Sequence, residues 1–116
     1  MVINLLNDLT IKKDIVTFSV SPENITGEKG AGGMAVQGSA SYAARELGVG
    51  WKVNPYLVSQ PGETTVLADI KGQGSIKHIW ITDSAQAGRL LIWRIYFDGC
   101  EKPAVEAPLS DFFANA

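Results

Sequence analysis

The chain has 116 residues, 46% hydrophobic and 19% charged, which is typical of one globular domain over residues 1–116 and excludes a disordered segment. Ten basic and twelve acidic side chains give a formal net charge of −2, and the basic residues form no stripe that would bind a nucleic acid. A single cysteine excludes an intramolecular disulfide, and no apolar run approaches the roughly 20 residues that cross a bilayer.

The first part of the chain predicts a strand, a glycine-rich loop and a short helix, in that order. Residues 15–20 alternate with a period of two, which indicates a half-buried strand whose Val16 face points inward. A proline and four glycines then interrupt the pattern over residues 21–33 and predict a shaped loop. Alanine and leucine next recur with helical spacing, with Ser39 as the N-cap and Gly48 just after the last turn.

After this helix the period of two returns and predicts a run of strands. The Pro61-Gly62 pair predicts a type II turn, and Asp98-Gly99 predicts a second turn. Pro108 begins a helical turn that carries two phenylalanines. The predicted strands are 51–59, 64–70, 75–82, 89–97 and 104–107. Short strands without βαβ alternation indicate an all-β fold, an antiparallel β-sandwich forming part of a jelly roll, with one short helix.

Two of these strands, 75–82 and 89–97, are apolar on both faces, so we expect them to be central in the sandwich. The first carries His78, the only histidine of the chain. A zinc site would need further ligands at suitable spacing, and none is found. We therefore predict a hydrogen-bonded core histidine and no metal site.

The glycine-rich loop does not have the pattern of a phosphate-binding motif. A P-loop ends in Gly-Lys followed by a hydroxyl residue, whereas Lys29 precedes the last glycines. Residues 30–35 fit the loose dinucleotide pattern, but they lack the βαβ context in which it has meaning. We expect no nucleotide and no other cofactor.

Carboxylates and aromatic side chains are the remaining candidates for chemistry. Cleavage of a glycosidic bond canonically requires two carboxyl groups at a fixed separation. Glu106 lies on the last predicted strand, and Asp111 lies in the turn before the two phenylalanines, where it caps the turn or contacts a substrate. Aromatic faces can stack on sugar rings, and Trp51, beside Gly50, is the one expected to be exposed. We expect core positions for Trp80, Trp93, Tyr56 and Tyr96.

Four stretches in the same order resemble glycoside hydrolase family 172, also called domain of unknown function 2961. The resemblance spans residues 19–113. Its departures are Ile25 in place of Pro, Phe97 in place of Trp and Ser110 in place of Gly. The four stretches are SPENITGEKGAGG, LGVGWKV, PGETTVLADIKGQGSIKHIWIT and IYFDGCEKPAVEAPLSDFF.

The resemblance implies a jelly-roll enzyme that acts on α-linked furanosides as a symmetric oligomer, without a metal. In the family the two catalytic glutamates follow the element that matches residues 111–113, so we expect no catalytic residue in this chain. The loop residues Asn24, Glu28 and Lys29 are expected to help form the sugar pocket of a neighbouring subunit. Trp51 and Asp111 complete the expected substrate-binding set.

Three hypotheses for the function remain open. The chain is a truncated family member that is inactive alone, a non-catalytic structural or sugar-binding module, or the complementing subunit of a split enzyme. The expected partners are a furanoside and either further copies of the chain or a missing C-terminal half, without nucleic acid or membrane. Because the first residues lack the basic-then-apolar order of a secretory signal, we expect a cytoplasmic protein.

Overall fold

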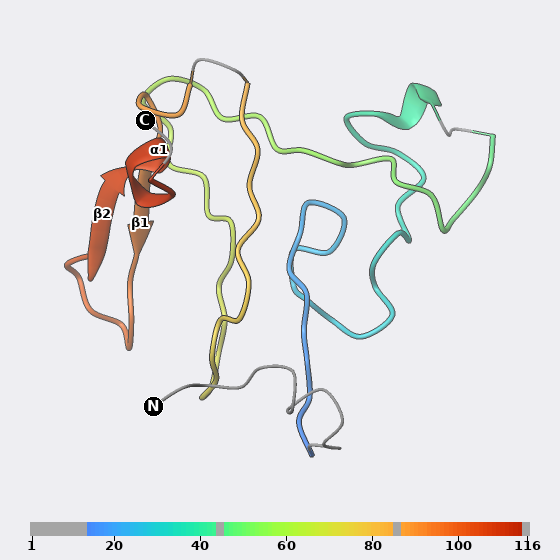
Figure 1. Ribbon diagram of the computed structural model, residues 1–116. Coiled ribbons are helices and arrows are strands. Elements are labelled where there is room, and N and C mark those ends of the chain that lie inside the picture. The colour runs from blue at the N-terminus through green and yellow to red at the C-terminus, as the bar shows by residue number, and fades with distance from the viewer. Residues whose placement is uncertain (1–13, 44–45, 85–86, 115–116) are drawn as a thin grey trace. The chain divides into compact units, whose positions relative to one another are not determined.

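A computed structural model describes residues 14–43, 46–84 and 87–114. The chain divides into two compact units, residues 1–72 and 73–116, and each is described by itself. Among the described residues, the regular elements are the 3₁₀ turn η2 (Ser41–Ala43), the strands β1 (Ile92–Ile95) and β2 (Val105–Pro108), and the helix α1 (Leu109–Phe112) (Figure 1). Among the helices within the described ranges, none has the length and apolar character needed to span a membrane.

In the second unit, β1 and β2 form an antiparallel ribbon in which Trp93 lies opposite Ala107. The turn between them places Asp98 and Gly99 at φ angles of 53° and 71°, and the N–H of Cys100 donates to the Phe97 carbonyl at 2.9 Å. Two positive φ angles in succession are typical of the tight hairpin turn that matches strand twist. The predicted turn is confirmed, and the two predicted strands that flank it are confirmed in part.

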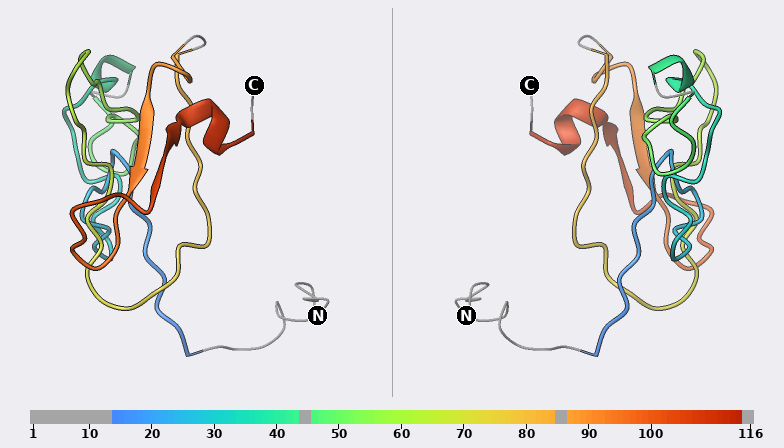
Figure 2. Two further views of the ribbon diagram at one scale, coloured as in Figure 1. Left: turned by 90° about the vertical axis from the view of Figure 1, so that its left-hand side faces the viewer. Right: turned by 90° about the vertical axis from the view of Figure 1, so that its right-hand side faces the viewer.

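The helix α1 follows directly from the end of β2 and packs on the ribbon (Figure 2). Its first residue, Leu109, is buried, and the Leu109 N–H donates to the Leu91 carbonyl at 2.9 Å. The Phe112 ring lies 5.8 Å from the Trp93 ring, and Phe113 meets Phe112 edge-on at 5.0 Å. Such tilted and edge-on pairs are favoured by the aromatic quadrupole. The predicted helical turn after Pro108 is therefore confirmed, with an aromatic cluster holding it to β1.

In the first unit, the packing is centred on Val53, the side chain of which is fully buried. The N–H of Ala40 donates to the Val53 carbonyl at 2.8 Å, which joins the segment after the glycine-rich loop to residues 51–59. Gly38 lies so close that an added Cβ would stand 2.6 Å from the Val53 carbonyl oxygen and 2.8 Å from Asn54 Cβ. This approach therefore requires glycine at position 38.

The predicted helix near residues 39–48 is wrong in its extent. Within the described residues this region holds the 3₁₀ turn η2, where Ala43 donates to the Ala40 carbonyl three residues earlier. Residues 44–45, which the prediction included, lie outside the described residues. The Ser39 hydroxyl donates to the Tyr56 carbonyl at 3.4 Å, and its predicted role as an N-cap stays a prediction.

The predicted strands 15–20, 51–59, 64–70 and 75–82 contain no helix and form no strand ladder within the described ranges. Val16 and Phe18, expected to face inward, are 78% and 72% exposed. The expected central position of strand 89–97 is also wrong, because among the described residues β1 pairs only with β2. A period of two determines which side chains share a face, whereas a ladder also requires a partner at hydrogen-bonding distance.

The predicted type II turn at Pro61-Gly62 is confirmed. Gly62 has a φ of 81°, and the N–H of Glu63 donates to the Gln60 carbonyl at 3.0 Å, which closes the turn. Turns of this kind are determined by the two central residues, so the sequence alone is sufficient to place them.

The contact at Gly38 predicts a large loss of stability on adding one methyl group. We expect Gly38→Ala to lower the free energy of unfolding by about 1–3 kcal/mol, because the backbone at Val53 must shift to make room. Urea denaturation followed by tryptophan fluorescence measures this loss. The matched control is Gly32→Ala, where an added Cβ meets nothing within 4 Å. Equal stability of the two variants would contradict the packing described for Val53.

Candidate functional site

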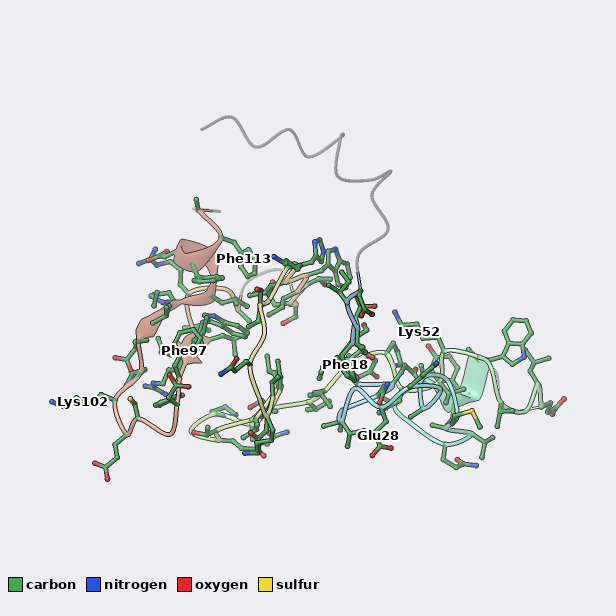
Figure 3. All side chains as sticks on the ribbon, turned by 90° about the horizontal axis from the view of Figure 1, so that it is seen from below. Phe18, Glu28, Lys52, Phe97, Lys102 and Phe113 are labelled. Carbon is green, nitrogen blue, oxygen red and sulfur yellow. The ribbon has the colours of Figure 1, made fainter. Side chains whose placement is uncertain are left out.

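Three of the five predicted site residues line one hollow of about 520 Å³ in the first unit. Asn24, Glu28 and Lys29 contribute to it from the glycine-rich loop, and residues 15–19 form its other side. We call this hollow the loop hollow; Figure 3 labels two of the residues that line it, Phe18 and Glu28. The structure thus brings together side chains that the sequence placed in one loop without showing that they meet.

Asn24 is the residue around which the loop is built. The backbones of Ser21 and Asn24 exchange two hydrogen bonds, of 3.1 and 2.8 Å, which close a tight bridge. The Asn24 side-chain amide then donates to the Glu28 carbonyl at 2.9 Å. Gly27 lies between them at a φ of 72°, a conformation that favours glycine. Asn24 therefore holds the loop in shape as well as lining the hollow.

Glu28 and Lys29 are both exposed and carry opposite charges next to each other in the chain. Within the part of the chain that the structure describes, neither charged group takes part in a hydrogen bond or ion pair of its own. A carboxylate accepts hydrogen bonds and an ammonium group donates them. Together with the exposed Phe18 ring, the loop hollow thus offers an acceptor, a donor and an apolar surface, which suits a polyhydroxylated ligand.

Sequence reasoning missed part of this hollow. Thr17 and Ser19 line it, and their alternation with apolar residues marked them as the polar face of a predicted strand. Phe18 also lines it, although the same alternation predicted that this ring faces the interior. The alternating polar residues therefore indicated part of the lining of the hollow, whereas the alternating apolar residues did not.

Trp51 is 51% exposed, as the sequence predicted for an aromatic platform. It does not belong to the lining of the loop hollow. Its predicted role in sugar binding stays a prediction.

Asp111 lies in the second unit and is held by an ion pair with Arg89. The predicted capping role is wrong, because the N-cap of α1 is Pro108 and no side-chain hydrogen bond caps the helix. Backbone bonds from Leu109 and Ser110 to residues 91 and 88 bring α1 against the segment that carries Arg89. The Arg89 guanidinium group is therefore close enough to pair with the Asp111 carboxylate, which the sequence analysis had expected to cap the helix.

Glu106 has a similar partner across the ribbon. The Arg94 Nε–H donates to a carboxylate oxygen of Glu106, and the two residues are direct register partners in β1 and β2. This hydrogen bond, together with the negative charge of Glu106, raises the pKa of Arg94 above its usual value. The arginine therefore stays charged and keeps one oxygen of Glu106 occupied.

A second hollow, of about 570 Å³, lies in the second unit, and the sequence did not predict it. Phe97, Phe113 and His78 are among the residues that line it, and Figure 3 labels both phenylalanines. His78 is exposed, so the predicted core histidine is wrong. Trp80, Tyr56 and Tyr96 are also exposed instead of buried, and Trp93 is only half-buried. Within the described ranges, no group of three or more metal-binding side chains occurs.

A family model described as GH172 first beta-sandwich domain matches residues 39–116, about two thirds of the chain. No curated protein matches the chain. Trp51 and Asp111 lie inside the matched segment, whereas the loop hollow lies before it. The β-sandwich class predicted from the sequence agrees with this description.

The Arg89 ion pair predicts how Asp111 contributes to stability. We expect a double-mutant cycle of Arg89→Gln and Asp111→Asn to give a coupling free energy of about 0.2–1 kcal/mol, because both side chains are partly exposed. Thermal unfolding of the four proteins measures this coupling. If Asp111 acted only as a cap, Asp111→Asn would have little effect with or without Arg89, because asparagine caps as well as aspartate, and the coupling would be zero.

Proposed function

The chain belongs to glycoside hydrolase family 172, and on that premise we propose that it binds an α-linked furanoside without cleaving it by its own residues. The observation that carries the proposal is the loop hollow, in which Asn24, Glu28 and Lys29 come together. These residues lie before the matched segment, in the stretch SPENITGEKGAGG, which resembles the family in its sequence. The fold of the proposed module is a partial jelly roll.

The chemistry of a furanoside fits the loop hollow. Vicinal hydroxyl groups can donate to the Glu28 carboxylate and accept from the Lys29 ammonium group. The exposed Phe18 ring offers a surface for the C–H face of the sugar. Because both charged groups lack partners among the described residues, a sugar displaces no existing ion pair when it binds.

The absence of cleavage follows from the state of the two carboxylates that the sequence singled out for chemistry. Glu106 and Asp111 are each bonded to an arginine, so the guanidinium groups compete with a substrate for their oxygens. A retaining mechanism requires a nucleophile and an acid with carboxyl groups about 5–5.5 Å apart, both free to act on the sugar.

A second candidate function is assembly, which the exposed apolar side chains favour. Val16, Trp80 and Leu90 are each more than half exposed, although such residues are usually covered in a folded protein. Further copies of the chain, or a polypeptide that supplies the rest of the sandwich, would cover them. This candidate corresponds to a structural module or to the complementing subunit of a split enzyme.

Binding is tested at the charged pair of the loop hollow. We expect Glu28→Gln and Lys29→Met each to weaken the binding of a methyl α-furanoside by about tenfold, since a hydrogen bond to a charged group contributes about 1.5–3 kcal/mol. Isothermal titration calorimetry measures the affinity. The matched controls are Glu101→Gln and Lys102→Met, which change an exposed Glu-Lys pair in the β1–β2 connection; Figure 3 labels Lys102. Equal losses at both pairs would contradict a site at the loop.

Cleavage is tested separately on a panel of aryl α-furanosides. We expect the purified chain to release no aryl group above the uncatalysed rate, because its two candidate carboxylates are held by arginines. Absorbance of the released phenol measures turnover. Turnover that Glu106→Gln or Asp111→Asn abolishes would contradict the proposal.

A further inference from the structure

The glycine-rich loop, residues 21–33, is fixed at its start by two hydrogen bonds, each between a side chain and the backbone of the other segment. One oxygen of the Glu23 carboxylate accepts the backbone N–H of Asn54. In return, the Asn54 side-chain amide donates to the Pro22 carbonyl at 2.7 Å. Each residue thus binds the backbone of the other segment, which holds residues 22–23 at a fixed position on residue 54.

The loop is fixed again at its end. The Gly50 N–H donates to the Gly33 carbonyl at 2.7 Å. Residues 50–54 therefore bind both ends of the loop, and the candidate residues Asn24, Glu28 and Lys29 lie between the two attachment points. A loop with both ends bound has far fewer accessible conformations than one bound at a single end.

The polar groups of Asn54 are almost fully used. Its side-chain oxygen accepts from the Ser39 N–H at 3.4 Å and from the Ser39 hydroxyl at 3.3 Å, in addition to the contacts with Glu23 and Pro22. Asn54 thus joins three segments of the first unit. A side chain with this many directional contacts can adopt one orientation only.

Glu23 is bound differently. Its second carboxylate oxygen is buried and has no hydrogen-bond partner. Burying a carboxylate oxygen without a partner is unfavourable and offsets part of what the hydrogen bond to the Asn54 N–H contributes to stability. Because the oxygen is shielded from solvent, it cannot contact a sugar either. The effect of Glu23 must therefore act through the backbone of residue 54.

We propose that Glu23 and Asn54 are positioning residues of the sugar site, which set the conformation of the loop so that Asn24, Glu28 and Lys29 face the loop hollow together. This inference rests on the proposed sugar binding and goes beyond it, because neither residue lines the hollow. It would give residues 50–54, which lie inside the matched segment, a role in a site that lies before that segment.

The test uses Glu23→Ala and the conservative Glu23→Gln, which retains a carbonyl oxygen for the Asn54 N–H. We expect Glu23→Ala to weaken binding of a methyl α-furanoside about tenfold and to speed tryptic cleavage after Lys29 in the loop. Cleavage after Lys77, in the second unit, stays at the wild-type rate. Glu23→Gln stays within about twofold of wild type in all three measurements, since the hydrogen bond is retained.

Several results would overturn the inference. One is that Glu23→Ala binds the methyl α-furanoside with wild-type affinity. Another is that Glu23→Gln weakens binding as much as Glu23→Ala does. If the wild-type chain binds no furanoside, the proposed function fails, and the rate of cleavage after Lys29 alone decides whether Glu23 positions the loop. Faster cleavage after Lys77 would show that Glu23→Ala unfolds the chain. In that case Asn54→Asp replaces it, because this change removes the side-chain donor to the Pro22 carbonyl. Asn54→Asp is then required to give the results expected for Glu23→Ala.

Discussion

The first unit depends on the attachment of the glycine-rich loop to residues 50–54. The loop contains no regular helix or strand among its residues, so hydrogen bonds within the loop and to residues 50–54 determine its shape. Val53, buried at the centre of these residues, binds the Ala40 N–H, and Asn54 binds Pro22 and Ser39. One short stretch of extended chain therefore organises everything around the loop hollow.

The elements that the sequence predicted correctly are local. The turns at Pro61-Gly62 and Asp98-Gly99 depend on the backbone preferences of two neighbouring residues, and the structure confirms both. The helical turn after Pro108 is also local, because proline is well suited to the start of a helix. In each of these cases, the energetic preference is contained within a few adjacent residues.

The predictions that failed required knowledge of a distant partner. Alternation indicated a buried Val16 face, but a buried face needs a second layer, and a strand needs a neighbouring ladder. Asp111 has an intrinsic preference for a cap, but Arg89, 22 residues earlier, binds it instead. Similarly, family resemblance suggested Asn24, Glu28 and Lys29, whereas Glu23 went unnoticed because its partner, Asn54, is 31 residues away.

Amide hydrogen exchange of the wild-type chain, followed by NMR, tests this attachment most directly. The N–H groups of Ala40, Gly50 and Asn54 each donate a hydrogen bond between residues 50–54 and the rest of the first unit. The account predicts that they exchange much more slowly than the amides of residues 66–70, which donate no hydrogen bond within the described part of the chain. Equally fast exchange in both groups would contradict it.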